Sequence, residues 1–157
     1  MLRKNHIYTL LAVGFLVFAA APSALAATKA STATSLLRAV NTTRASFGLR
    51  PLKLDVRLGR AAQAHTAEML RGNYFSHGDF HGRMVTFAVQ GSVAGENLAW
   101  GSGSFSQAST IVKEWLASPE HRANLLRARY TRIGLGIGQG TFQGAGGATV
   151  VTADFAG

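Results

Sequence analysis

The chain places hydrophobic residues at helical spacing over much of its length. A first helical pattern begins at Ser35 and meets a stop signal at Gly48, with apolar positions at Leu36, Leu37, Val40 and Phe47. A second pattern follows Asp55, which can cap a helix, and ends at Gly72 and Asn73. One face of this second helix is lined by Leu58, Ala61, Ala62, His65, Met69 and Leu70.

Two further helices are predicted in the second half of the chain. A stretch from about Ser106 to Leu116 turns Ile111, Val112 and Trp115 to one side. Ser118 and Pro119 are then the residue types of a helix cap and a first helical position. This short helix is predicted to run to about Arg127.

The hydrophobic period changes near the C-terminus. In "RIGLGIGQG" the residues Ile133, Leu135 and Ile137 alternate with glycines, and "ATVVTADFAG" is rich in Val and Thr. The turn-rich link "TFQGAGG" between them predicts a β-hairpin. Helices come first, strands come last and no βαβ alternation is present, so the pattern predicts an α+β layered domain.

The N-terminus has the organisation of a secretory signal peptide. Arg3 and Lys4 precede an apolar run over 7–21, and the small-residue triplet 24–26 supplies an A-x-A cleavage site. The run is shorter than the roughly 20 residues of a membrane-spanning helix. We therefore expect a signal peptide over 1–26, a spacer over 27–34 and one domain over 35–157, with no transmembrane segment after cleavage. The expected location is secreted or periplasmic.

Composition adds two constraints. The 157 residues include no cysteine, so the exported domain must be stabilised by packing without disulfides. Lys and Arg number 16 against 7 Asp and Glu, which favours anionic partners such as cell-surface polymers or lipids. An arginine-rich composition can equally be a general solubility feature. No nucleic-acid motif accompanies the charge, so no specific nucleic-acid binding is predicted.

Several motifs occur in a fixed order along the predicted domain. They are "NTTR" at 41–44, "GLRPL" at 48–52, "YFSH" at 74–77, "GENLAWG" at 95–101, "WLASPEHRANLL" at 115–126 and "RIGLGIG" at 132–138. Together they resemble the CAP superfamily of cysteine-rich secretory, antigen 5 and pathogenesis-related proteins, in its short cysteine-free bacterial branch. The resemblance covers residues 35 to 156.

The resemblance implies a three-layer α-β-α sandwich with a central antiparallel sheet and a shallow cleft. In the family this cleft holds two histidines and two glutamates. His77 matches the first histidine, Glu96 the glutamate of the "GEN" element, and His121 the second histidine. The second glutamate normally follows the tryptophan by three positions, and this chain has Ser118 there. The ligand-binding cleft is therefore predicted to contain His77, Glu96, Ser118 and His121.

Two interpretations of this set remain open. Two imidazoles and one carboxylate can hold zinc or another divalent metal with an open coordination position, which makes His77, His121 and Glu96 candidate metal ligands. Alternatively, Glu96 hydrogen-bonds the two histidines and only ties loops over the sheet. The main functional hypothesis is a secreted, non-catalytic domain that presents this cleft to a metal or small ligand at the cell surface.

Catalysis is the alternative, with the same residues His77, Glu96 and His121 as candidates. A metal- or serine-dependent hydrolase of peptide or cell-wall material lacks support from an HExxH or G-x-S-x-G motif. Family members that carry lipids or sterols suggest a third possibility.

Other residues of the motifs are predicted to be structural. His65 is expected in the core, and His81 in a solvated loop because Gly78 and Gly82 flank it. Trp100 and Trp115 are expected in the core, and Asn97 is expected to bond backbone.

Overall fold

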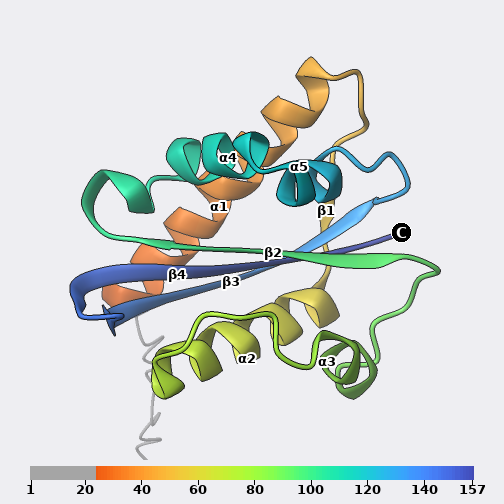
Figure 1. Cartoon of the computed structure of the whole chain (residues 1–157). Helices are drawn as coiled ribbons and strands as arrows, with labels where there is room; N and C mark the ends of the chain where they lie inside the picture. Colours follow the sequence, from red (N-terminus) through yellow and green to blue (C-terminus); the bar gives the residue numbers. More distant parts are fainter. Residues whose placement is uncertain (1–23) are drawn as a thin grey trace, which may run out of the picture.

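The computed structural model describes residues 24–157, which form helices on both faces of a four-stranded sheet (Figure 1). The elements, in chain order, are α1 (Ala24–Ser46), β1 (Lys53–Leu54), α2 (Val56–Gly72), α3 (Phe80–Thr86), β2 (Ala94–Gly101), the 3-10 helix η1 (Gly103–Ser106), α4 (Ala108–Ala117), α5 (Pro119–Leu125), β3 (Arg132–Phe142) and β4 (Ala145–Ala156).

The strand order is β1-β3-β4-β2, so β1 and β2 form the two edges of the sheet. β1 is parallel to β3, and the other two pairings are antiparallel. The predicted hairpin of β3 and β4 is confirmed, and it turns at Gln143 and Gly144, which both have positive φ. Positive φ at two successive residues matches the twist of a tight hairpin turn. The sheet is thus central and mainly antiparallel, as expected.

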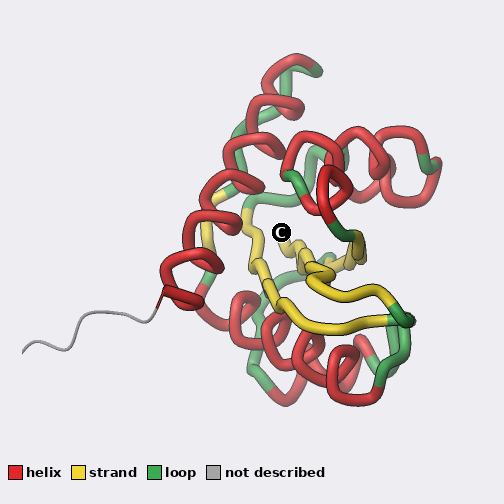
Figure 2. The backbone as a smooth tube through the Cα atoms, turned by 90° about the vertical axis from the view of Figure 1, so that its left-hand side faces the viewer, coloured by secondary structure: helices red, strands yellow, loops and turns green. Residues whose placement is uncertain are grey.

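Two helical layers cover the sheet. The helices α1, α4 and α5 lie on one side, and α2 and α3 lie on the other (Figures 1 and 2). On the first side, Trp115 of α4 and Leu36 of α1 belong to one buried cluster with Ile133 and Val151 of the sheet. This arrangement confirms the three-layer α-β-α sandwich.

Alternating glycines in β3 explain how closely α2 approaches the sheet. A Cβ atom at Gly134 would overlap the backbone of Leu58, and one at Gly136 would overlap the backbone of Ala62. These positions therefore admit only a hydrogen in place of a side chain, because the helix backbone occupies the space. The repeated glycines of "RIGLGIG" are a packing requirement of the helix–strand contact.

Two polar residues of α1 fix the chain that leaves it. Asn41 exchanges two hydrogen bonds with the backbone of Leu52, at 2.8 and 3.0 Å. Arg44 is completely buried, and its guanidinium donates to the carbonyls of Arg50, Leu125, Arg127 and Tyr130 at 2.9–3.2 Å. Five N–H donors in a rigid fork suit such a cluster of carbonyls. The "NTTR" motif therefore joins α1 to the linker that follows it and to the distant segment 125–130.

Some boundaries differ from the sequence prediction. The first helix starts at Ala24 rather than Ser35, so the residues 27–34 expected as a spacer are helical. The spacing of apolar residues could not predict a helix over 27–34, since this stretch consists mostly of Ala, Thr and Ser. Asp55 caps α2 as predicted, and its carboxylate accepts from the N–H groups of Arg57 and Leu58. The predicted signal peptide lies outside the described residues except for 24–26. None of the described helices has the length and hydropathy to cross a bilayer.

Candidate functional site

The site is built around the edge strand β2, which carries the "GEN" motif. Two carbonyl groups of β2 accept hydrogen bonds from side chains of the neighbouring helices α4 and α5. Trp115 Nε1 donates to Leu98 O at 2.9 Å, and Asn124 Nδ2 donates to Glu96 O at 3.1 Å. Asn97 Nδ2 donates to the carbonyl of His121 at 3.0 Å, which confirms that Asn97 bonds backbone. These contacts place α5, and with it His121, beside Glu96.

Glu96 is the centre of the polar cluster. Its side chain is only 2% exposed, and each carboxylate oxygen has its own partner. Oε1 lies 2.6 Å from Nδ1 of His77, and Oε2 lies 2.6 Å from a terminal guanidinium nitrogen of Arg83. Arg83 also donates to the carbonyl of His77 at 2.8 Å. One buried carboxylate thus orients the His77 ring, and Arg83 holds the backbone of the same histidine.

The His77 ring is oriented outward by this arrangement. Its side chain is 57% exposed, and its Nδ1 is taken by Glu96. Among the described residues nothing hydrogen-bonds Nε2 of this ring, so Nε2 is the nitrogen available to a ligand. A carboxylate on one imidazole nitrogen is the usual way to fix the tautomer of a histidine whose other nitrogen binds a metal.

His121 lies close enough to sense the charge of His77. Burial lowers the pKa of His121, and the neighbouring His77 lowers this pKa further, against an opposing effect of Glu120. The neutral imidazole is therefore favoured at neutral pH, and neutral imidazole is the form that binds metal. Within residues 24–157 no hydrogen bond occupies the His121 ring. The two histidines predicted from sequence therefore lie near enough to each other to interact electrostatically.

A second carboxyl group lies behind Glu96, and sequence reasoning did not identify it. Asp154 of β4 is opposite Glu96 in the strand pairing and is completely buried. Both of its oxygens are buried, and the neighbouring carboxylate of Glu96 is the group to which a protonated Asp154 can donate. Burial raises the pKa of Asp154 to about 9, the negative charge of Glu96 adds to the increase, and Arg83 opposes it. Asp154 is therefore a neutral carboxylic acid at pH 7.

An aromatic hollow adjoins His121. It has a volume of about 350 Å³ and lies between β2, η1 and α4, and its lining includes Phe75, Trp100, Phe105, Ser118 and His121. Trp100 is 38% exposed and stacks edge-on against buried Phe142, so the expectation of a core Trp100 was wrong, whereas Trp115 is buried as predicted. The hollow thus places the His121 imidazole beside an accessible aromatic wall.

Comparison with known proteins agrees with this architecture. The model of the cysteine-rich secretory protein (CAP) family matches residues 37–155. The chain belongs to this family. Among curated proteins, the uncharacterized protein YkwD of Bacillus subtilis is 36% identical over 101 residues, which are 61% of this chain and 38% of YkwD. Pathogenesis-related protein 1C of Nicotiana tabacum is 33% identical over 88 residues, 56% of this chain and 45% of that protein. The matched part is therefore less than half the length of these relatives.

Solved CAP structures share the fold. An extracellular protein with an SCP domain from Bacillus anthracis superposes with a TM-score of 0.68 at 27% identity, covering 78% of this chain and 39% of the other. A cysteine-rich secretory protein from Staphylococcus aureus gives a TM-score of 0.67 at 20% identity, covering 81% and 38%. The expected membership in a cysteine-free bacterial branch of the CAP family is confirmed.

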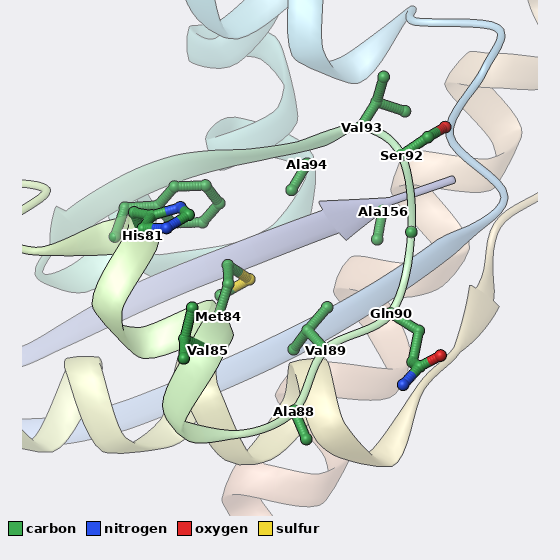
Figure 3. A pocket seen from close by; sticks show the side chains of 12 residues that line it. His81, Met84, Val85, Ala88, Val89, Gln90, Ser92, Val93, Ala94 and Ala156 are labelled. Carbon is green, nitrogen blue, oxygen red and sulfur yellow. The ribbon is translucent and has the colours of Figure 1, made fainter.

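Two further histidines lie outside the CAP cleft. His65 is buried in α2 as predicted, with Nε2 at 2.9 Å from Ser76 O. His81 is exposed as predicted, but it lies in the first turn of α3 rather than in a loop. The N-cap Asp79, whose carboxylate accepts from the N–H of Gly82, permits this helix despite the flanking glycines. His81 borders a separate hollow of about 390 Å³ near Met84 (Figure 3).

The geometry limits the chemistry of the cleft. In the described part of the chain no three His, Asp or Glu side chains are grouped to hold a metal together, because both oxygens of Glu96 face protein donors. Ser118 is the N-cap residue of α5 as predicted, but its side chain makes no capping hydrogen bond. Within residues 24–157 no hydrogen bond joins Ser118 to His121. Catalysis by Ser118 would require an acidic residue that orients His121 as the general base. The carboxylate of Glu96 orients His77 instead.

Proposed function

We propose that the protein is an exported, non-catalytic CAP domain whose His77–His121 cleft binds a divalent metal or a small ligand at the cell surface. The observation that carries this proposal is the 2.6 Å contact between Glu96 Oε1 and His77 Nδ1, which leaves Nε2 of an exposed ring free. An imidazole that only filled space would not need a buried carboxylate to fix its orientation.

The donor set fits a zinc-type ion with modest affinity. His77 and His121 would hold the ion through ring nitrogens, and Glu96 would act on His77 as its hydrogen-bonding partner. Water would complete the coordination, since Ser118 stands where the family usually has a second carboxylate. Such an ion supplies Lewis acidity when bound. No hydrogen bond from a described residue orients the His121 ring as a general base, which is why the proposed role is binding rather than hydrolysis.

The aromatic hollow would contribute to the recognition of an organic ligand. Trp100 and Phe105 expose ring surface beside His121, and exposed rings bind apolar or ring-bearing groups with little loss of side-chain entropy. A ligand with a metal-binding or hydrogen-bonding group at one end and an apolar portion at the other would use both parts.

Export is supported by features of this chain and of its structural neighbours. The first 26 residues have the order of a signal peptide, with a charged start, an apolar run and an A-x-A end. The similar protein from Bacillus anthracis is described as extracellular, and a similar structure from Borrelia burgdorferi is an outer surface protein. We expect exported protein to begin at or near Ala27, which the intact mass of protein recovered outside the cytoplasm would test.

Calorimetric titration with zinc at two pH values, below and above the histidine pKa near 6.5, tests the metal site. Binding should be stronger at the higher pH, because protons compete for the ring nitrogens. His77→Ala and His121→Ala should each weaken binding by about ten-fold or more, whereas His81→Ala, which removes an exposed histidine outside the cleft, should bind as the wild type does. Equal binding by all four proteins, or binding by none, would exclude the metal site.

A hydrolase screen on the same proteins separates binding from catalysis. Turnover of peptide or cell-wall material that is lost in Ser118→Ala or His121→Ala would replace the proposed function with a hydrolytic one. Lipid that co-purifies with the protein would instead point to lipid carriage.

A further inference from the structure

The linker between α1 and α2 forms an exposed strip at the β1 edge of the sheet, opposite the cleft. It passes from the helical layer of α1 to that of α2 along β1 (Figure 1). Its sequence over 47–57, "FGLRPLKLDVR", alternates basic and apolar residues. Unlike most exposed linkers, it leaves large apolar side chains in water: Leu54 is 64% exposed, Val56 is 71% exposed, and Phe47 is also exposed.

Positive charge converges on the same edge. Buried Arg44 binds the carbonyls of Arg50 and Arg127, so these two exposed arginines are held near each other. Lys53 is paired with Arg132 in the parallel register of β1 and β3. Arg50, Lys53 and Arg132 line one open hollow of about 520 Å³.

One ion pair offsets part of this charge. Asp55 is the only acid in the linker, and its carboxylate accepts from Arg57 N, from Leu58 N and from the Arg132 guanidinium at 2.8 Å. Arg132 is therefore paired, and Arg50, Lys53 and Arg127 carry the excess positive charge. The remaining acids of the described chain lie on other elements: Glu68, Asp79, Glu96, Glu114, Glu120 and Asp154. A surface with this excess of cations attracts anions over about one Debye length, roughly 8 Å at physiological salt.

We propose that the β1 edge, formed by residues 47–57 with Arg127 and Arg132, docks the protein on an anionic lipid bilayer. Cations bind the phosphate headgroups, and the exposed Leu54 and Val56 enter the interfacial region. The exposed Leu54 and Val56 favour a bilayer over a soluble polyanion as the partner. A bilayer has an apolar region that can bury aliphatic side chains, whereas a phosphate polymer in water has none. β2 is the opposite edge of the sheet, so docking through β1 leaves the cleft beside Glu96 facing away from the membrane.

Co-sedimentation with vesicles tests this proposal independently of the cleft. Wild-type protein should bind phosphatidylcholine vesicles that contain phosphatidylglycerol, and bind pure phosphatidylcholine weakly. Arg50→Gln/Lys53→Gln should reduce the partition coefficient roughly 10- to 30-fold, since each cation near an anionic bilayer contributes roughly five-fold. Arg71→Gln/Lys113→Gln removes the same charge from exposed positions on α2 and α4 and should have a much smaller effect.

The apolar part has its own pair of variants. Leu54→Ser/Val56→Ser should weaken vesicle binding several-fold at unchanged net charge, whereas Val85→Ser, at another exposed apolar position, should not. Soluble polyphosphate at equal phosphate concentration should compete poorly. If the serine variants bind vesicles as the wild type does and polyphosphate competes fully, the edge is a polyanion site and the bilayer proposal is overturned. His77→Ala should leave vesicle binding intact, so failure of the zinc site and failure of the membrane edge are distinguishable.

Discussion

Replacing Asp154 with asparagine should remove one contribution by which the protein loses stability as pH rises. Asp154 is buried against Glu96, and its pKa is raised to about 9 by burial first and by the charge of Glu96 second. In the unfolded chain an aspartate has a pKa near 3.9. Between these two values the folded protein holds a proton that the unfolded chain has released. Folding therefore takes up a proton, and the folded state loses stability as pH rises through this window.

The size of the effect follows from the width of the window. One proton taken up on folding changes the free energy of unfolding by about 1.4 kcal/mol per pH unit. From about pH 5 to about pH 7, Asp154 should therefore lower the stability of the wild type by roughly 2–3 kcal/mol. Asparagine has the shape of the protonated acid and cannot ionise, and its amide can donate to Glu96 as the protonated carboxyl can. Asp154→Asn should therefore not show this loss of stability as pH rises.

Urea unfolding of both proteins across this pH range measures the difference. The stability of Asp154→Asn relative to the wild type should increase by about 2–3 kcal/mol from about pH 5 to about pH 7, because all other titrating groups are common to the two proteins. Glu114→Gln, which neutralises an exposed acid, should run parallel to the wild type. If the Asp154→Asn curve also runs parallel, Asp154 is ionised in the folded protein and the description of the carboxyl pair is refuted.

Two further substitutions test the packing around the site and the sheet. Glu96→Ala should cost about 1–3 kcal/mol of stability in urea unfolding, because it leaves Arg83 and His77 without their partner, whereas exposed Glu120→Ala should change stability by less than about 0.5 kcal/mol. Gly136→Ala should lower the melting temperature by several degrees, since its Cβ would overlap the backbone of α2 at a cost of about 1–3 kcal/mol or more. Its control is Gly146→Ala, which meets no atom within 4 Å and should be close to neutral. Equal melting of the two alanine variants would contradict the packing argument for "RIGLGIG".

The sequence was informative where local chemistry decides structure. Asp55 predicts a helix start because a carboxylate can satisfy free N–H groups, and in the structure it accepts from two of them. From Ile133 the apolar residues alternate, which is the spacing of a strand and not of a helix. Two such strand-like runs joined by a turn-rich link predict the hairpin. The helix over 27–34 was missed because Ala, Thr and Ser carry no apolar stripe, so nothing local separates a helix from a spacer there.

Residues that act through strand pairing could not be found in this way. Asp154 sits in a strand rich in Val and Thr, and only the register that sets it opposite Glu96 makes it part of the site. Arg83 lies six residues after His77 in α3, and only the folded structure shows that its guanidinium reaches Glu96 of β2. The resemblance to the CAP family supplied His77, Glu96 and His121, and the two partners that determine how Glu96 behaves came from tertiary structure alone.

The charge balance around Glu96 explains why metal binding in this cleft should be weak. Glu96 is already paired with Arg83 at 2.6 Å, so little of its negative charge is left for a ligand. Asp154 cannot add negative charge while it holds its proton, and Ser118 provides none at the position where the family usually has a second glutamate. A divalent ion would therefore be held by two neutral imidazoles, with no carboxylate at residue 118 to add to the charge that Glu120 exerts on His121. Ser118→Glu would add that charge beside His121, and in the calorimetric titration it should tighten zinc binding by ten-fold or more. Unchanged affinity in this variant would show that residue 118 does not face the ion.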